Sequence, residues 1–173
     1  IKAGCALRRG RKTQEPQPTK SRSPITNVLV AMASSDNEYL ATLKFLDAAF
    51  PGESGYQIGI RPHPEFSLDK ALARLPNLGL NFQRMDGTLE NNFLWADIVV
   101  YVSSTVGLDS IATGIPSVSI DMGYFTNYDP ASSSCPFKWT VSKPDQLVRT
   151  FQEIDKIPDG EYSYLQNQAR AFG

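Results

Sequence analysis

Hydrophobic residues along this chain form two alternating patterns, short continuous runs and stripes with helical spacing. The runs Val28–Ala33 and Ile98–Val102 contain no charged residue, which is typical of strands covered on both faces of a parallel sheet. Between Asp36 and Phe50, apolar residues recur every three or four positions, which predicts a helix with one buried face. The alternation predicts an α/β fold: a doubly wound, Rossmann-like parallel sheet of five or six strands in a single domain.

Shorter signals predict the remaining elements. Further strands are expected over Tyr56–Ile60, Leu80–Gln83, Val118–Ile120 and Phe137–Val141. Helix boundaries are expected at the caps Ser67 and Thr88, at Ser35 with Glu38 in capping-box spacing, at the stop Gly114, after Ser142, and over the closing stretch Tyr162–Phe172.

The composition is that of an ordinary globular protein. The 173 residues are 41% hydrophobic and 20% charged, and nothing approaches the roughly 18 consecutive apolar residues of a membrane span. The two cysteines, Cys5 and Cys135, lie far apart, and there is one histidine, so neither a disulfide framework nor a zinc site made by protein ligands is expected. Sparse cysteine favours a reducing, cytoplasmic location, and we expect no metal site.

Charge is distributed unevenly. Residues 1–24 carry seven basic groups and one acid, whereas the chain as a whole has a net charge of −1. Such a basic arm can approach an anionic membrane surface, which would give a peripheral association at the inner face of the membrane. Its prolines and lack of apolar periodicity fit a solvated linker better, and we expect no nucleic-acid binding. We therefore predict a basic, Pro-rich lead-in over 1–26 and a nucleotide-binding domain over 27–173.

The hydroxyl residues Ser103, Ser104 and Thr105 follow a predicted strand and precede a predicted helix. The carboxyl ends of parallel strands are where ligands bind in open sheets, and a helix start favours anions. Three hydroxyl groups in a row therefore indicate a phosphate cradle. An ordinary helix N-cap explains one such residue equally simply.

His63, the one histidine, lies between two prolines directly after a predicted strand. Because Pro62 and Pro64 restrict the backbone, the histidine is held in a stiff, extended segment at the end of that strand. Imidazole can donate to or pair with phosphate. A structural role is the alternative, but the shared sheet edge with Ser103–Thr105 favours function.

The segment Arg61–Pro64, together with Ser103–Thr105, Asp109 and the sequence Ala-Thr-Gly-Ile-Pro over 112–116, resembles the C-terminal, nucleotide-binding half of GT-B glycosyltransferases. The His-Pro pair is most similar to the branch of bacterial sialyl- and polysialyltransferases, capsular Kdo transferases and CDP-glycerol glycerophosphotransferases. The resemblance covers about residues 27–154. UDP-GlcNAc 2-epimerases share the part that ends in Gly-Ile-Pro.

This resemblance implies a role for each residue. His63 would be catalytic, stabilising the departing phosphate, while the three hydroxyl residues 103–105 would bind the same phosphate. Asp109 stands where the family often has a glutamate that binds ribose, although it is one methylene shorter and equally fits an exposed helix carboxylate. The turn Met85–Thr88 would meet the base. No metal and no cofactor besides the nucleotide-activated donor is implied, with CMP- or CDP-linked donors favoured and UDP-linked ones as rivals.

The resemblance further implies the donor-binding domain of a glycosyltransferase or polyol-phosphate transferase of surface polysaccharide, such as capsule. The family's acceptor-binding N-terminal half has no counterpart in this sequence, so we expect the chain to bind nucleotide sugar but to be inactive alone. The alternatives are an epimerase-like domain and a non-enzymatic Rossmann-like interaction module. Epimerase chemistry needs further histidines and carboxylates near the sugar.

Overall fold

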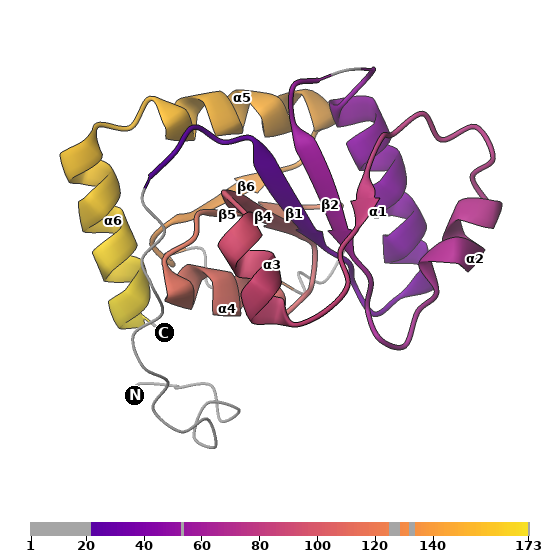
Figure 1. Ribbon diagram of the computed structural model, residues 1–173, viewed down its shortest axis with the longest axis horizontal. Helices are drawn as coiled ribbons and strands as arrows, with labels where there is room; N and C mark the ends of the chain where they lie inside the picture. The colour runs from indigo at the N-terminus through magenta and orange to yellow at the C-terminus, as the bar shows by residue number, and fades with distance from the viewer. Residues whose placement is uncertain (1–21, 53, 125–128, 132–133, 173) are drawn as a thin grey trace.

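A parallel sheet forms the centre of the computed structural model, which describes residues 22–52, 54–124, 129–131 and 134–172 (Figure 1). Its six strands lie in the order β3-β2-β1-β4-β5-β6 and every neighbouring pair is parallel. They are β1 (Asn27–Ala31), β2 (Gln57–Arg61), β3 (Gln83–Arg84), β4 (Ile98–Tyr101), β5 (Ser117–Ile120) and β6 (Lys138–Val141). The prediction of a doubly wound, Rossmann-like sheet in a single domain is confirmed.

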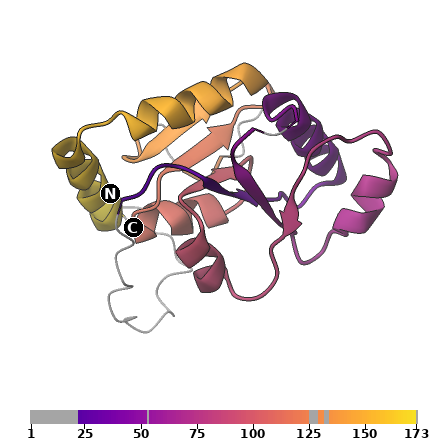
Figure 2. The same cartoon turned by 45° about the horizontal axis from the view of Figure 1, so that its top comes forward.

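Helices cover both faces of the sheet (Figures 1 and 2). In the described residues they are α1 (Asp36–Ala49), α2 (Leu68–Ala73), α3 (Leu89–Trp95), α4 (Val106–Thr113), α5 (Pro144–Asp155) and α6 (Asp159–Phe172). Helices α1, α2 and α5 pack on one face, and α3, α4 and α6 lie on the other. None of these helices is long and apolar enough to cross a bilayer.

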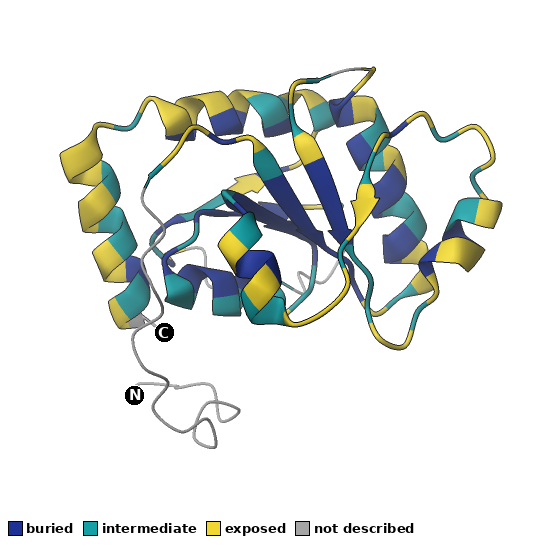
Figure 3. Cartoon of the chain, viewed as in Figure 1, coloured by how far each residue is buried: buried dark blue, intermediate teal, exposed yellow. Residues whose placement is uncertain are grey.

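The central strands are buried on both sides, as their continuous apolar sequences predict (Figure 3). Val28 and Val30 of β1 join the core under α1 and α5, whereas Leu29 packs with Phe93 of α3 on the opposite face. Successive side chains of a strand point to opposite faces, so a strand between two helix layers is apolar or, as in β5, pairs its buried hydroxyls: Ser117 with Ser110 and Ser119 with Thr140.

Most local predictions hold. The side chain of Ser67 accepts the Lys70 N–H at 3.3 Å, and the side chain of Thr88 caps α3 in the same way. Gly114 ends α4 with a φ of 80°, in the left-handed region that favours glycine.

Two local predictions are wrong. The side chain of Ser35 makes no capping hydrogen bond, and the Glu38 side chain accepts from Ser103 in the turn after β4. The strand expected over Leu80–Gln83 is the short edge strand Gln83–Arg84, while Leu80 is buried in the core and does not pair with the sheet.

The contacts of the domain begin within the segment predicted as linker, of which residues 1–21 lie outside the described part. Ile25 is buried in the core, and its N–H donates to Asp155 at 3.0 Å. The Asp97 carboxylate accepts the N–H groups of Thr26 and Asn27 at 3.1 and 2.8 Å. Residues 22–26 therefore pack as part of the folded domain.

Candidate functional site

Strands β1 and β4 lie side by side where the strand order reverses. Ala31 pairs with Tyr101 in register, so the two strands end at the same level. The chain then leaves β1 for α1 on one face and leaves β4 for α4 on the other. Such a divergence opens a crevice beyond the carboxyl ends, where open α/β sheets bind ligands.

One hydrogen bond connects the two sides of this crevice. Ser103 Oγ, in the turn after β4, donates to Oε2 of Glu38 at 3.1 Å. Glu38 lies in the first turn of α1 and is only 8% exposed. The first hydroxyl of the predicted cradle is therefore held by a carboxylate.

The other two hydroxyl residues of the turn have different environments. Ser104 Oγ accepts the Val106 N–H at 3.3 Å and so caps α4, and the Ser104 carbonyl accepts the Gly107 N–H at 3.1 Å. Thr105 is exposed and its side chain makes no capping hydrogen bond. Asp109 follows in the first turn of α4 and is half-buried. Ser104, one of the three residues of the predicted cradle, therefore caps α4. Thr105 is the exposed hydroxyl residue of the cradle.

His63 lies in a tight turn after β2. The His63 carbonyl accepts the Phe66 N–H at 3.1 Å, and Nδ1 of its ring accepts the Glu65 N–H at 3.3 Å. An imidazole nitrogen that accepts carries no proton, so this network assigns the proton of the neutral ring to Nε2. The ring is half-exposed, with an edge contact to Phe66 at 5.9 Å between centroids. His63 is therefore oriented as a donor through Nε2.

A pocket of about 430 Å³ adjoins this turn. It lies between the carboxyl ends of β2 and β3, and its walls are the segments Arg61–Ser67 and Arg84–Gly87 together with Asp69. The pocket brings His63 together with the turn that was predicted to meet the base.

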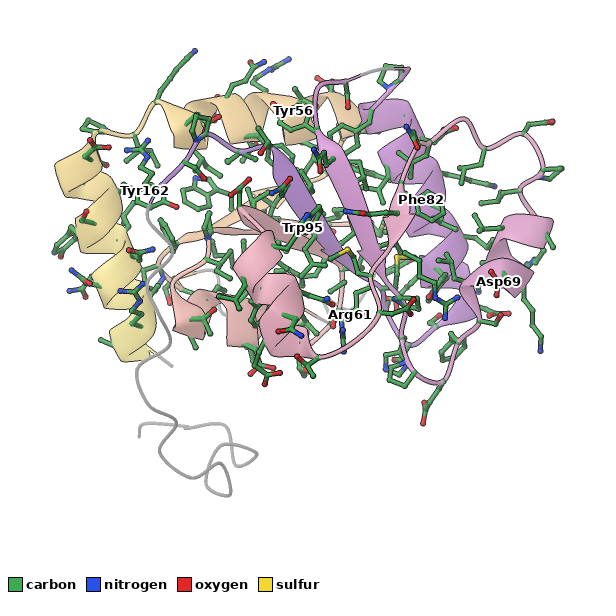
Figure 4. The ribbon with its side chains drawn as sticks, viewed as in Figure 1. Tyr56, Arg61, Asp69, Phe82, Trp95 and Tyr162 are labelled. Carbon is green, nitrogen blue, oxygen red and sulfur yellow. The ribbon has the colours of Figure 1, made fainter. Side chains whose placement is uncertain are left out.

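Arg61 fixes one wall of the pocket (Figure 4). Its guanidinium donates to the Gly87 carbonyl at 3.1 Å and to Oδ1 of Asn92 at 2.6 Å. The buried Asn92 amide donates in turn to the Asp86 carbonyl at 3.2 Å. These bonds hold the turn between β3 and α3 against the end of β2. Arg61 thus positions this wall of the pocket.

His63 and the Ser103–Thr105 turn share one edge of the sheet but line different spaces. Strand β1 lies between β2 and β4, and two strand spacings separate β2 from β4 by about 10 Å. None of the three hydroxyl residues lines the His63 pocket. Consecutive residues of α1 occupy the intervening position: Glu38 contacts Ser103, and Tyr39 lies toward His63.

Tyr39 supports the His63 turn from inside the domain. Its ring stacks on Phe66 at 6.4 Å, and Phe66 contacts the imidazole. The Tyr39 hydroxyl is buried and makes no hydrogen bond to any described residue. Burial raises the pKa of this hydroxyl, which the nearby backbone of His63 partly offsets.

The cations at the β3 end of this edge are already paired. Arg84 contacts Asp86 at 3.0 Å and Asp69 at 3.7 Å. Within the described ranges, no group of three or more histidine, cysteine or acidic side chains could hold a metal ion. Arg61 donates only to uncharged oxygens, so a phosphate at this edge would meet Arg61 and His63 together with hydroxyl and backbone N–H groups.

Sequence reasoning missed Glu38 and Asn92. Glu38 was assigned to a capping box, since a glutamate three residues after a serine at a helix start has that spacing. Asn92 gave no signal, because its partner Arg61 is 31 positions away in the chain.

No protein-family model matches the chain, and the comparison with curated proteins gives no match. Solved structures are similar in fold. The structure of TarM from S. aureus in complex with UDP has a TM-score of 0.62 and 11% identity, over 94% of this chain and 34% of that one.

Two further structures have the same arrangement. The wall teichoic acid polymerase TagF with CDPG has a TM-score of 0.55 and 19% identity, over 87% of this chain and 36% of TagF. UDP-GlcNAc 2-epimerase from Neisseria meningitidis, bound to UDP-GlcNAc, has a TM-score of 0.58 and 13% identity, over 86% of this chain and 41% of the epimerase. The chain thus spans less than half the length of each.

Proposed function

We propose that this chain is the donor-nucleotide-binding domain of a glycosyltransferase or polyol-phosphate transferase of surface polysaccharide. One observation carries the proposal: His63, fixed as an Nε2 donor, and the Ser103–Thr105 turn flank the same carboxyl edge on either side of β1. The fold shared with TarM and TagF, solved with UDP and CDPG, supports a nucleotide-linked ligand.

The proposed chemistry follows from the charge that develops during transfer. When the bond between the nucleotide phosphate and the transferred group breaks, negative charge grows on the departing phosphate. Donors aimed at that charge stabilise the transition state, and the loss of one such donor slows analogous reactions by about 10²–10³-fold. In this proposal His63 Nε2–H and the Thr105 hydroxyl are these donors, and no metal takes part.

The nucleoside lies on the side of α3 and α4. The turn Met85–Thr88, held by Arg61, meets the base, and Asp109 on α4 meets the ribose. We favour CMP- or CDP-linked donors, with UDP-linked donors as rivals.

Turnover needs a second, acceptor-binding domain. The chain spans between 34% and 41% of the three structures compared above, which supports a division of labour between two domains. We propose that the chain binds the donor alone but transfers it only with that partner. We place it in the cytoplasm, with a peripheral contact to the inner face of the membrane.

A titration followed by NMR tests the proposal. CMP, CDP, UDP and GDP should shift the amide signals of His63, Thr105 and Gly87, and the affinities should rank the bases. His63→Ala should weaken diphosphate binding, and His63→Gln, whose amide can still donate, should weaken it less. Shifts elsewhere, or equal affinities for all three proteins, would remove the histidine from the site.

An epimerase-like domain is the second candidate, because the Neisseria enzyme shares the fold. Incubation with UDP-GlcNAc distinguishes the two. Epimerised product would favour this second candidate, whereas binding without conversion fits the transferase domain. Absence of any nucleotide binding would favour a non-enzymatic interaction module.

A further inference from the structure

The carboxylate of Glu38 has one hydrogen-bond donor among the described residues, and neither of its oxygens is a buried atom without a partner, so the second oxygen is open to solvent or a ligand. Glu38 is 8% exposed, and among the described residues only Ser103 donates to it. An ionised carboxylate has about four acceptor sites, and a buried one is normally matched by a cation or by several donors. No lysine or arginine of the described part forms an ion pair with Glu38. Acceptor capacity at the crevice is therefore unused.

The one described hydrogen-bond donor to the Glu38 carboxylate is a hydroxyl group. Ser103 lies on one side at 3.1 Å. Tyr124, in the segment after β5, is 43% exposed, and the pKa of its hydroxyl is raised by burial and next by the charge of Glu38. The segment after β4 thus brings the Ser103 hydroxyl to the carboxylate, and the segment after β5 carries the exposed Tyr124.

The position of Glu38 relative to the nucleotide is also defined. The base turn leads into α3 and Asp109 belongs to α4, and these two helices pack on one face of the sheet. Glu38 belongs to α1, which packs on the other face. Because Glu38 is hydrogen-bonded to Ser103, two residues before Thr105, a donor whose phosphate meets Thr105 has its transferred group within reach of Glu38.

We infer that Glu38 selects donors whose transferred group is uncharged and rich in hydroxyl groups, such as a neutral hexosyl group. Sugar hydroxyls donate to the open acceptor sites of the carboxylate, with the Ser103 hydroxyl beside them. A transferred group that carries a carboxylate next to the anomeric carbon is repelled. The inference rests on the proposed function and narrows it, since it disfavours CMP-linked acidic sugars and retains neutral sugars linked to CDP or UDP.

Matched ligands test this inference on the 173-residue chain. Calorimetry gives the affinity of UDP-glucose relative to UDP, and of CMP-N-acetylneuraminate relative to CMP. In the unmodified chain, the glucosyl group should strengthen binding and the acidic sugar should weaken it, each relative to its own bare nucleotide. A glucosyl group that adds no affinity to UDP, in a chain that does bind UDP, overturns the inference and leaves the proposed function intact.

Variants at Glu38 locate the effect. Glu38→Gln retains the shape and an acceptor for Ser103 but removes the charge, so the gain from the glucosyl group should fall about tenfold, in line with a lost hydrogen bond to a charged group. The penalty on the acidic sugar should shrink as well. Asp36→Asn, which neutralises an exposed acid of the same helical turn, should change neither ratio.

Glu38→Asp keeps the carboxylate charge but shortens the side chain by one methylene group. This variant replaces the glutamine variant in the test if the latter does not fold. It should keep the penalty on the acidic sugar and lose the glucosyl gain. If the glutamine variant folds and leaves both ratios unchanged, Glu38 is only a structural acceptor for Ser103 and the inference fails. If neither UDP nor CMP binds to the unmodified chain, the proposed function fails first.

Discussion

Lys138 Nζ lies 2.6 Å from the Asp129 carboxylate in an ion pair whose side chains are 5% and 6% exposed. Lys138 also donates to the Ala131 carbonyl at 2.9 Å, and the Tyr101 hydroxyl donates to Asp129 at 3.0 Å. Burial, and next the charge of Asp129, raise the pKa of Tyr101. The pair therefore fastens residues 129–131 to β4 and β6.

Removing one partner of this pair should be far more damaging than removing both. Lys138→Met leaves the Asp129 carboxylate buried without its cation, which costs about 3–5 kcal/mol in comparable pairs. The double change Lys138→Met with Asp129→Asn should recover a large part of that loss, because the amide removes the unpaired charge and its oxygen still accepts from Tyr101 and Ala131. Denaturant unfolding of both variants measures it. Equal stability of the single and double variants would contradict the buried pair.

Gly107 lies against the ring of Tyr101. A methyl group added to Gly107 would meet ring carbons of that tyrosine at 2.4–2.6 Å, and Tyr101 is fully buried. Gly107→Ala should therefore destabilise the domain by about 1–3 kcal/mol, the usual effect of overpacking a core. Thermal or denaturant unfolding checks the value.

Gly160 provides the matched control. It lies in the first turn of α6, and an added methyl group would meet nothing within 4 Å. Gly160→Ala should be neutral or stabilise by up to about 1 kcal/mol, because alanine loses less backbone entropy in a helix. A loss of stability in both variants would show that crowding against Tyr101 is not the cause.

Tyr162 should make stability depend on pH at the alkaline end. Burial raises the pKa of Tyr162 to about 12, although the Arg22 guanidinium, 4.5 Å from the ring centroid, acts in the opposite direction. The pKa of Tyr162 in the folded chain exceeds the value near 10 of the unfolded chain. The contribution of Tyr162 to the free energy of unfolding is therefore complete below pH 10 and is lost as pH rises toward 12.

Melting temperatures between pH 8 and 12 test this dependence. In Tyr162→Phe the decline between pH 10 and 12 should be shallower than in the unmodified chain. The exposed Tyr164 supplies the control, and Tyr164→Phe should follow the unmodified chain. A decline of the same steepness in the Tyr162 variant would place the titrating group elsewhere.

The architecture could be predicted because each central strand carries its own signal. From Val28 to Ala31 strand β1 is apolar and is covered on both faces, so its sequence alone indicates its position in the sheet. Edge strand β3 has no such signal: it consists of two polar residues, paired with Gly59 and Ile60 of β2. Residues 22–26 were equally hard to assign to the folded domain. Ile25 is a single apolar residue beside a proline, and its hydrogen-bond partner Asp155 is 130 positions away.

Only the part of the candidate site that depends on the order of elements along the chain could be predicted. His63 and Ser103–Thr105 could be assigned to one sheet edge, because each directly follows a strand of a parallel sheet. The role of each hydroxyl could not be predicted. Ser103 differs from its neighbours because Glu38, 65 positions away, accepts its hydrogen bond. Their convergence on one phosphate oxygen stays a prediction.

Substitutions of Ser104 and Thr105 should affect different properties, the first the stability of the domain and the second its affinity for nucleotide. Ser104 Oγ caps α4 by accepting the Val106 N–H, so Ser104→Ala should cost about 1 kcal/mol of stability. Thr105 is exposed and makes no capping bond through its side chain, so Thr105→Ala should leave stability unchanged. Under the proposed function, it should weaken nucleoside diphosphate binding several-fold.

Thr105→Ser is the control for the second variant, because it removes a methyl group and keeps the hydroxyl. Binding in this variant should match the unmodified chain. Chemical denaturation and calorimetry with UDP and CDP give both quantities for all three variants. If Thr105→Ala and Thr105→Ser bind these nucleotides equally, the Thr105 hydroxyl does not meet the phosphate. The anion would then depend on backbone N–H groups and His63.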